Sequence, residues 1–127
     1  MRTLLIFLFC LSLFSCTKSK NNDISYSLRM VTKVDGATTG VINQAIPLTV
    51  YWFFTSGSCD ILDKFEETRL GNIVTVKAYG HYSGQVCTAD AGIKTKIYNF
   101  ISPTPGTFEL RFVNPDNTVV TYTIIIS

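Results

Sequence analysis

The sequence predicts an all-β fold, an antiparallel β-sandwich of about seven strands. Leu48–Thr55 is rich in aromatic and β-branched residues and stops at turn residues, as a central strand does. Thr107–Val113 and Thr118–Ile126 alternate apolar and polar residues on either side of Asn114–Asn117, which is typical of a β-hairpin. Regular turn signals and the lack of any long helical period favour two packed sheets.

The central strand has two predicted faces. Its even positions are apolar, so we expect these four to point inward: Leu48, Val50, Trp52 and Phe54. Tyr51 and Phe53 then stand on the outer face. Immunoglobulin domains place a tryptophan between their two cysteines, whereas Trp52 precedes both Cys59 and Cys87 here. The prediction is therefore an immunoglobulin-like sandwich and nothing narrower.

The other elements follow from the same patterns. Ile24–Val34 alternates with period two, which predicts a strand with these residues on its apolar side: Ile24, Tyr26, Leu28 and Met30. Inward positions are also predicted at Val74, Val76, Ala78, Phe108, Leu110, Phe112, Val120, Tyr122, Ile124 and Ile126. We further expect a short edge strand in 37–45, a short helix or irregular edge strand in 60–70, a strand in 73–79, a loop in 80–92, and a bulged strand in 93–101.

The N-terminus has the pattern of a cleavable signal peptide. A short positive start precedes eleven apolar residues, Leu4–Phe14, and Ser15 is the small residue expected before a cleavage point. Eleven residues fall short of the roughly 20 that span a bilayer as a helix, so a retained transmembrane anchor is the less favoured alternative. The predicted organisation is a signal peptide over 1–15, a polar tether over 16–23 and one domain over 24–127.

Leu13-Phe14-Ser15-Cys16 resembles a bacterial lipobox, and the polar Thr17–Asp23 resembles the tether of Bacteroidota lipoproteins. The resemblance implies that Cys16 carries acyl chains such as palmitate and holds the protein on a membrane of the cell envelope, expected to be the outer membrane. The acidic run that sends such lipoproteins to the cell surface is missing here, so the membrane face stays open.

From Ala45 onward the chain is similar to small β-sandwich lipoproteins of Bacteroidota. The shared features are a proline-led aromatic strand at Pro47, the exit Gly57-Ser58-Cys59, the pair Cys87-Thr88, and the strand Pro105–Phe112. The resemblance covers about two thirds of the chain. It implies the fold and the cellular address, and it carries no activity.

The chain has four cysteines, and each has a predicted role. Cys10 is discarded with the signal and Cys16 is the lipid site. Cys59 and Cys87 remain in an oxidising compartment, where pairing is the default, so we predict a disulfide between them. A metal site is the weaker alternative, because the chain has one histidine and no C-x-x-C motif.

Charge and motifs exclude several function classes. Without Arg2 there are ten basic residues against nine acidic ones, so no nucleic-acid partner is expected. His81 and Ser83 stand close together, but the spacing is not that of a nucleophile elbow, so neither an enzyme nor a cofactor is predicted. Calcium could use the acidic set Asp60, Asp63, Glu66 and Glu67; without the spacing of a calcium loop, a solvated acidic segment is favoured.

Exposed aromatic residues indicate binding. Tyr51 and Phe53, with Tyr79 and Tyr82, form the predicted binding surface, although burial under a loop is the alternative for the first two. The predicted function is a lipid-anchored, non-catalytic binding or structural module for another envelope protein. The alternative is a small carbohydrate-binding module that stacks sugar rings on these aromatics.

Overall fold

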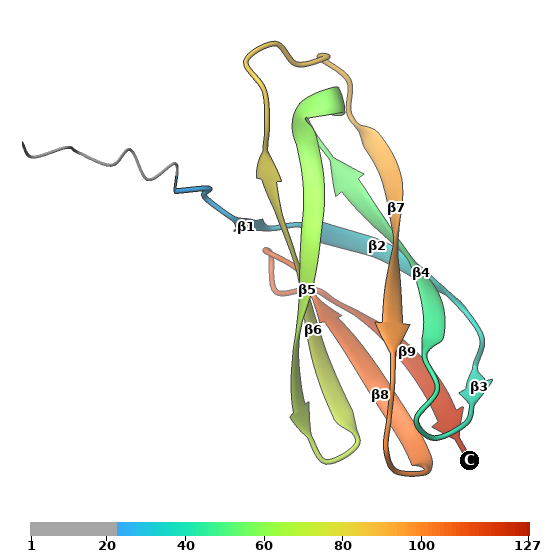
Figure 1. The fold of residues 1–127 in the computed structure, drawn as a ribbon. Coiled ribbons are helices and arrows are strands. Elements are labelled where there is room, and N and C mark those ends of the chain that lie inside the picture. The colour runs from blue at the N-terminus through green and yellow to red at the C-terminus, as the bar shows by residue number, and fades with distance from the viewer. Residues whose placement is uncertain (1–22) are drawn as a thin grey trace, which may run out of the picture.

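The computed structural model describes residues 23–127, so the predicted signal peptide, Cys16 and all of the predicted tether except Asp23 lie outside the described residues. The described chain is nearly all β and forms two sheets (Figure 1). The strands are β1 (Ser27–Leu28), β2 (Met30–Gly36), β3 (Thr39–Gly40), β4 (Ile46–Phe54), β5 (Asp60–Leu70), β6 (Ile73–Tyr82), β7 (Gly92–Phe100), β8 (Gly106–Val113) and β9 (Val119–Ile126). One 3-10 turn, η1 (Gly57–Cys59), follows β4.

The smaller sheet has three strands in the order β2-β4-β7, and the larger has six. In the six-stranded sheet, β5 pairs along the whole of β6. β1 and β8 share the other side of β6, and the sheet continues through β9 to β3. Buried residues of both sheets form a single apolar core, so the two sheets face each other across it.

The predicted faces of the central and C-terminal strands are confirmed. Leu48, Val50, Trp52 and Phe54 are buried in β4, and the hairpin β8–β9 forms as expected. The inward positions predicted on the other strands are buried or packed against the core: Val74, Val76, Ala78, Phe108, Leu110, Phe112, Val120, Tyr122, Ile124 and Ile126. Asn117 has a φ of 66°, which allows the tight turn between the two hairpin strands.

The pairing is not purely antiparallel as predicted. β6 and β8 pair in parallel, and so do β3 and β9. The strand count is nine rather than about seven because β1 and β3 are two-residue strands. Between β6 and β8 the chain crosses to the other sheet as β7, and this crossover brings β8 back in the same direction as β6. Alternation along one strand carries no information about such a partner.

The predicted inward face of the N-terminal strand is wrong. Arg29 and Val31 are buried, at 5% and 2% exposure, whereas Ile24 and Tyr26 are exposed. The reason is that the segment serves two sheets: β1 pairs with β6, and after Arg29 the chain enters the three-stranded sheet as β2. The side-chain amide of Asn114 binds the N–H and C=O of Val31 at 2.8 and 3.0 Å, as a neighbouring strand would.

Residues 60–70 form the edge strand β5, with a register shift between Leu62 and Lys64, which confirms the irregular edge strand rather than the short helix. Three other segments differ from their predictions. β6 continues through Tyr82, so the loop is confined to 83–91. β7 pairs with β4 in one unbroken register, without the expected bulge. The predicted edge strand in 37–45 is reduced to β3.

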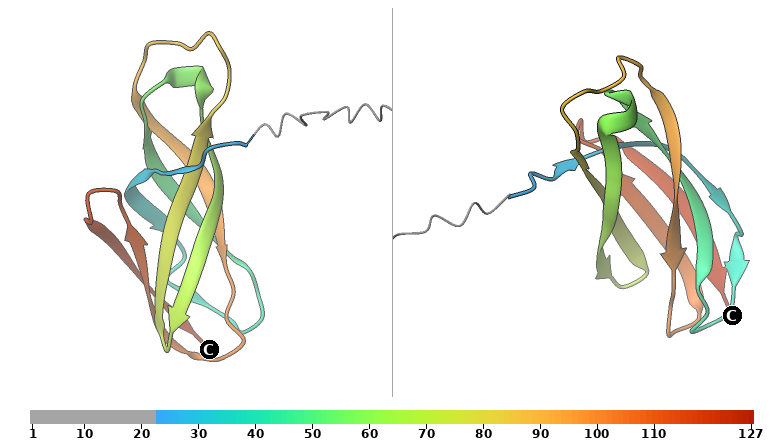
Figure 2. Two further views of the ribbon diagram at one scale, coloured as in Figure 1. Left: turned by 90° about the vertical axis from the view of Figure 1, so that its left-hand side faces the viewer. Right: turned by 45° about the horizontal axis from the view of Figure 1, so that its top comes forward.

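The disulfide between Cys59 and Cys87 is confirmed, with an S–S distance of 2.05 Å. It joins η1 to the loop over 83–91, and Figure 2 shows both segments at the same end of the molecule. Gly57 is needed for this close approach, because a Cβ there would lie 1.7 Å from the hydroxyl oxygen of Thr88. Close packing against Thr88 thus explains why position 57, just after β4, is a glycine.

Candidate binding surface

The outer face of the three-stranded sheet carries an apolar patch. The register places Phe53 opposite Ile93, Tyr51 opposite Thr95, and Thr49 opposite Ile97. Phe53 is 38% exposed and both isoleucines are 51% exposed, while Tyr51 is partly buried. We call Tyr51, Phe53, Ile93 and Ile97 the apolar face.

Strand geometry explains why these four side chains gather. Residues two apart on a strand share one face, and directly opposed residues on antiparallel strands lie about 5 Å apart. The outward positions of β4 and β7 are Pro47, Thr49, Tyr51, Phe53, Ile93, Thr95, Ile97 and Asn99, none of which carries a carboxylate, ammonium or guanidinium group. No charged side chain therefore interrupts the apolar face on these two strands.

On the β2 side, charged side chains flank this surface. Lys33 lies over the Tyr51 ring, with Nζ 5.3 Å from the ring centroid, and pairs with Asp35 at 2.6 Å. The hydrogen bond to Asp35 and its negative charge raise the pKa of Lys33 above its ordinary value. This side of the surface therefore has a charged rim.

The four aromatics of the predicted binding surface do not come together. Tyr51 and Phe53 lie on the three-stranded sheet, whereas Tyr79 and Tyr82 belong to β6 in the other sheet. Tyr79 is partly buried, with Lys64 5.9 Å from its ring centroid. The Tyr82 ring covers Arg29 at 4.6 Å, and its hydroxyl lies 3.0 Å from that of Thr55. One stacking platform built from all four residues is not present.

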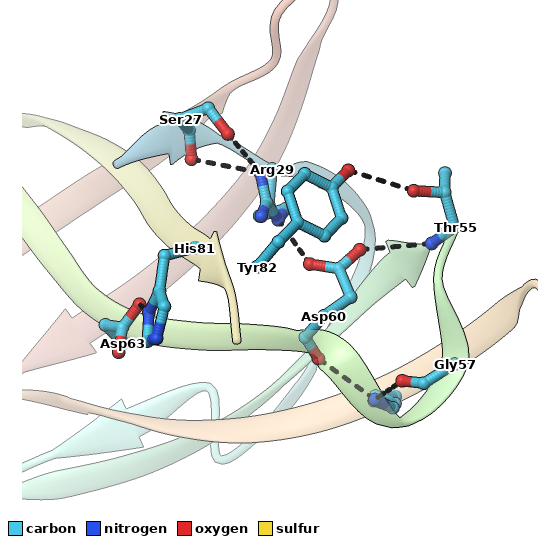
Figure 3. A network of polar contacts seen from close by, with 9 residues as sticks. Ser27, Arg29, Thr55, Gly57, Asp60, Asp63, His81 and Tyr82 are labelled. Carbon is cyan, nitrogen blue, oxygen red and sulfur yellow. Dashed lines mark hydrogen bonds and ion pairs between the residues drawn. The ribbon is translucent and has the colours of Figure 1, made fainter. Parts of the chain in front are cut away.

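Beneath Tyr82 lies a buried ion pair (Figure 3). Arg29 Nε donates to Asp60 Oδ1 at 2.7 Å, and the N–H of Thr55 donates to Asp60 Oδ2 at 3.0 Å. Arg29 Nη1 donates to Ser27, while Nη2 has no hydrogen-bond partner among the described residues. The pair connects the start of β5 to the segment between β1 and β2. Removing either member would leave an uncompensated charge in the interior.

His81 points to Asp63 on the neighbouring strand, with Nδ1 2.6 Å from the carboxylate (Figure 3). The Tyr26 ring and the imidazole pack in a T-shaped arrangement, with the ring centroids 5.9 Å apart. An aspartate bound to Nδ1 is one half of a catalytic triad, and the other half is a hydroxyl on Nε2. In the described part of the chain no hydroxyl hydrogen-bonds to His81.

The acidic residues 60–67 are dispersed rather than convergent. Each carboxylate contacts its own basic side chain, in the pairs Asp60–Arg29, Asp63–His81, Glu66–Lys64 and Glu67–Arg69. The strand sends alternate side chains to opposite faces, which separates them. Within residues 23–127 no group of three or more histidine, cysteine or acidic side chains is placed to hold a metal ion.

The sequence prediction missed Ile93 and Ile97 as surface residues. The signal was present, because the apolar residues of 93–101 did not keep to one face of a strand. We interpreted that irregularity as a bulge. The structure shows a regular strand that is apolar on its outward side and also contributes Tyr98 and Phe100 to the core.

Across residues 23–127, no helix has the length and apolar character needed to cross a membrane. No protein-family model matches the chain, and comparisons with curated proteins and with solved structures found no similar protein.

Proposed function

We propose that this chain is a lipid-anchored, non-catalytic binding module of the cell envelope, an immunoglobulin-like sandwich that docks onto another envelope protein. The observation that carries the proposal is the apolar face on β4 and β7. Phe53, Ile93 and Ile97 stand exposed on neighbouring strands, and no described segment covers them. Contiguous exposed apolar side chains with a charged rim are typical of protein-binding surfaces.

The decisive experiment compares the outer faces of the two sheets in intact cells. A photoreactive amino acid replaces Phe53 on the apolar face, or Thr121 on the outward side of β9, in the full-length lipidated protein. Docking predicts one discrete protein adduct from position 53 and none from position 121. Equal adducts from both positions, or none from position 53, would contradict the proposal.

A matched pair of variants tests whether the apolar side chains cause the contact. Ile93→Thr/Ile97→Thr removes two exposed branched side chains from β7 and should abolish the adduct, since threonine retains strand propensity. Val119→Thr/Ile125→Thr removes a similar pair from β9 and should leave the adduct unchanged. Glycan binding that is lost on Tyr51→Ala, without any protein adduct, would favour the carbohydrate-binding alternative instead.

The anchor is tested separately, because it depends on Leu13–Cys16, outside the described residues. We expect Cys16→Ser to prevent acylation and to release the protein from the membrane, since stable anchoring of a protein by lipid requires its acyl chains. Fractionation after a carbonate wash, with a Ser15→Ala control, measures this. Retention of the Cys16→Ser protein in the membrane pellet would refute the lipoprotein assignment.

A further inference from the structure

A cleft opens between the edge strands of the two sheets, next to the apolar face. β7 ends the three-stranded sheet, and β5 pairs only with β6 in the other. The cleft has a volume of about 310 Å³, and its lining includes Trp52 from β4, Ile61 and Leu62 from β5, and Lys94, Thr95 and Lys96 from β7. Trp52 makes the interior partly aromatic, and the two lysines make it cationic.

Both ammonium groups retain hydrogen-bonding capacity. Lys94 Nζ donates to the carbonyls of Gly57 and Asp60, at 2.6 and 3.0 Å. Lys96 Nζ donates to the carbonyls of Leu62 and Asp63, at 2.7 and 3.1 Å. An ammonium group has three N–H donors, so each lysine has one left for an acceptor in the cleft.

The charge of these lysines is not neutralised inside the cleft. Asp60 supplies the one carboxylate among the lining residues, and its two oxygens already accept from Arg29 Nε and the Thr55 N–H. Lys94 also lies over the Phe54 ring, 4.5 Å from its centroid, which holds the ammonium group against an apolar wall. A cleft with two cations and no uncommitted carboxylate is complementary to an anionic group.

β7 connects this cleft to the apolar face. Ile93 and Ile97 point outward from the strand, and Lys94 and Lys96, the alternate residues, point into the cleft. An extended segment lying along the free edge of β7 would therefore meet apolar and cationic side chains in alternation. Edge strands are the usual place for such strand addition.

We propose that the Lys94–Lys96 cleft binds the carboxylates of an extended partner segment in which acidic and apolar residues alternate. The proposal rests on the proposed function and specifies the chemistry of the docking partner. The acidic side chains would enter the cleft, and the apolar ones would pack beside Ile93 and Ile97.

Trp52 gives a direct readout, because it is the one tryptophan of the chain and lines the cleft. The full-length protein in detergent is titrated with a synthetic hexapeptide of alternating valine and glutamate, and its tryptophan fluorescence is recorded. We expect a saturable change, and about tenfold weaker binding when glutamine replaces glutamate in the peptide. This comparison uses the unmodified protein, so it does not depend on any variant folding.

Lys94→Gln/Lys96→Gln should weaken binding of the glutamate peptide by about tenfold or more, whereas Lys77→Gln, an exposed control on β6, should not. Equal binding of the glutamate and glutamine peptides would overturn the proposal. So would a response to digalacturonate without a response to the peptide, which would assign the cleft to acidic sugars. Either result, with the position-53 adduct retained, would refute the role of the cleft and leave the docking face intact.

Discussion

The outer face of the six-stranded sheet carries charged side chains that pair along its strands, whereas the outward positions of β4 and β7 carry none. Lys64 pairs with Glu66 at 3.2 Å on β5, and Arg111 pairs with Glu109 at 3.0 Å on β8. Val119 and Ile125 are exposed on β9 of this face as well, but the paired charges elsewhere on it favour contact with water. Apolar area left in water forgoes about 25 cal/mol per Å², and this difference between the faces is the reason we propose the apolar face as the contact surface.

The largest expected effect is a difference in stability between variants on the two faces of β4. Trp52→Ala should cost about 3–5 kcal/mol of unfolding free energy, the range for emptying a large buried aromatic site. Phe53→Ala should cost about 1–2 kcal/mol, because its side chain is already partly in water. Urea titrations measure both. Similar losses for the two variants would show that Phe53 is not on an exposed face.

Reduction of Cys59–Cys87 should affect the whole domain rather than one face. The cysteines are 28 residues apart, and closing a loop of that size stabilises a fold by about 3–4 kcal/mol. We expect a marked fall in melting temperature, while the β-sheet circular dichroism at room temperature persists. Cys59→Ala/Cys87→Ala should match the reduced protein. Reduction that left the melting temperature unchanged would argue against this role.

Alkaline pH should lower the free energy of unfolding through Tyr98 on β7, the strand that carries Ile93 and Ile97 of the apolar face. Burial, with a hydrogen bond to Glu67, raises the pKa of Tyr98 above its ordinary value near 10. The folded state therefore holds the Tyr98 proton more tightly than the unfolded chain does. The stabilisation from this proton is complete below about pH 10. It declines as the pH rises further, by up to about 1.4 kcal/mol of unfolding free energy per pH unit. Denaturant titrations across this range should show a smaller decline for Tyr98→Phe, and an equal decline would contradict the assignment.

The smallest expected effects are on stability at the two outer faces themselves. Ile97→Thr on β7 and Ile125→Thr on β9 should each change the unfolding free energy by no more than about 0.5 kcal/mol, since both side chains are about half exposed. Only the first should affect docking. A large loss of stability for Ile97→Thr alone would mean that this side chain is buried in the protein and not available to a partner.

Much of the fold was predictable because local alternation reports burial directly. The inward set of β4 and the hairpin β8–β9 follow from period-two patterns and turn residues. The disulfide followed from the count of cysteines and the compartment that the N-terminus predicts. Of the binding surface, the same alternation placed Tyr51 and Phe53 on the outer face of β4.

Other features depended on which strands become neighbours. Arg29 interrupts an apparently simple alternation because the chain changes sheets there and Asp60, 31 residues away, supplies its partner. The parallel pairing of β6 with β8 is likewise invisible to any pattern within one strand.

The sequence by itself thus determined where most of the strands lie and, for strands with clear alternation that stay in one sheet, which face is buried. Only the tertiary structure decided that Ile93 and Ile97 join Tyr51 and Phe53, and that Lys94 and Lys96 reach across to β5. The physical reason is the distance along the sequence over which each feature is determined. Alternation is a property of consecutive residues, whereas an outer face and an edge cleft are made by strands whose pairing depends on the packing of the whole core.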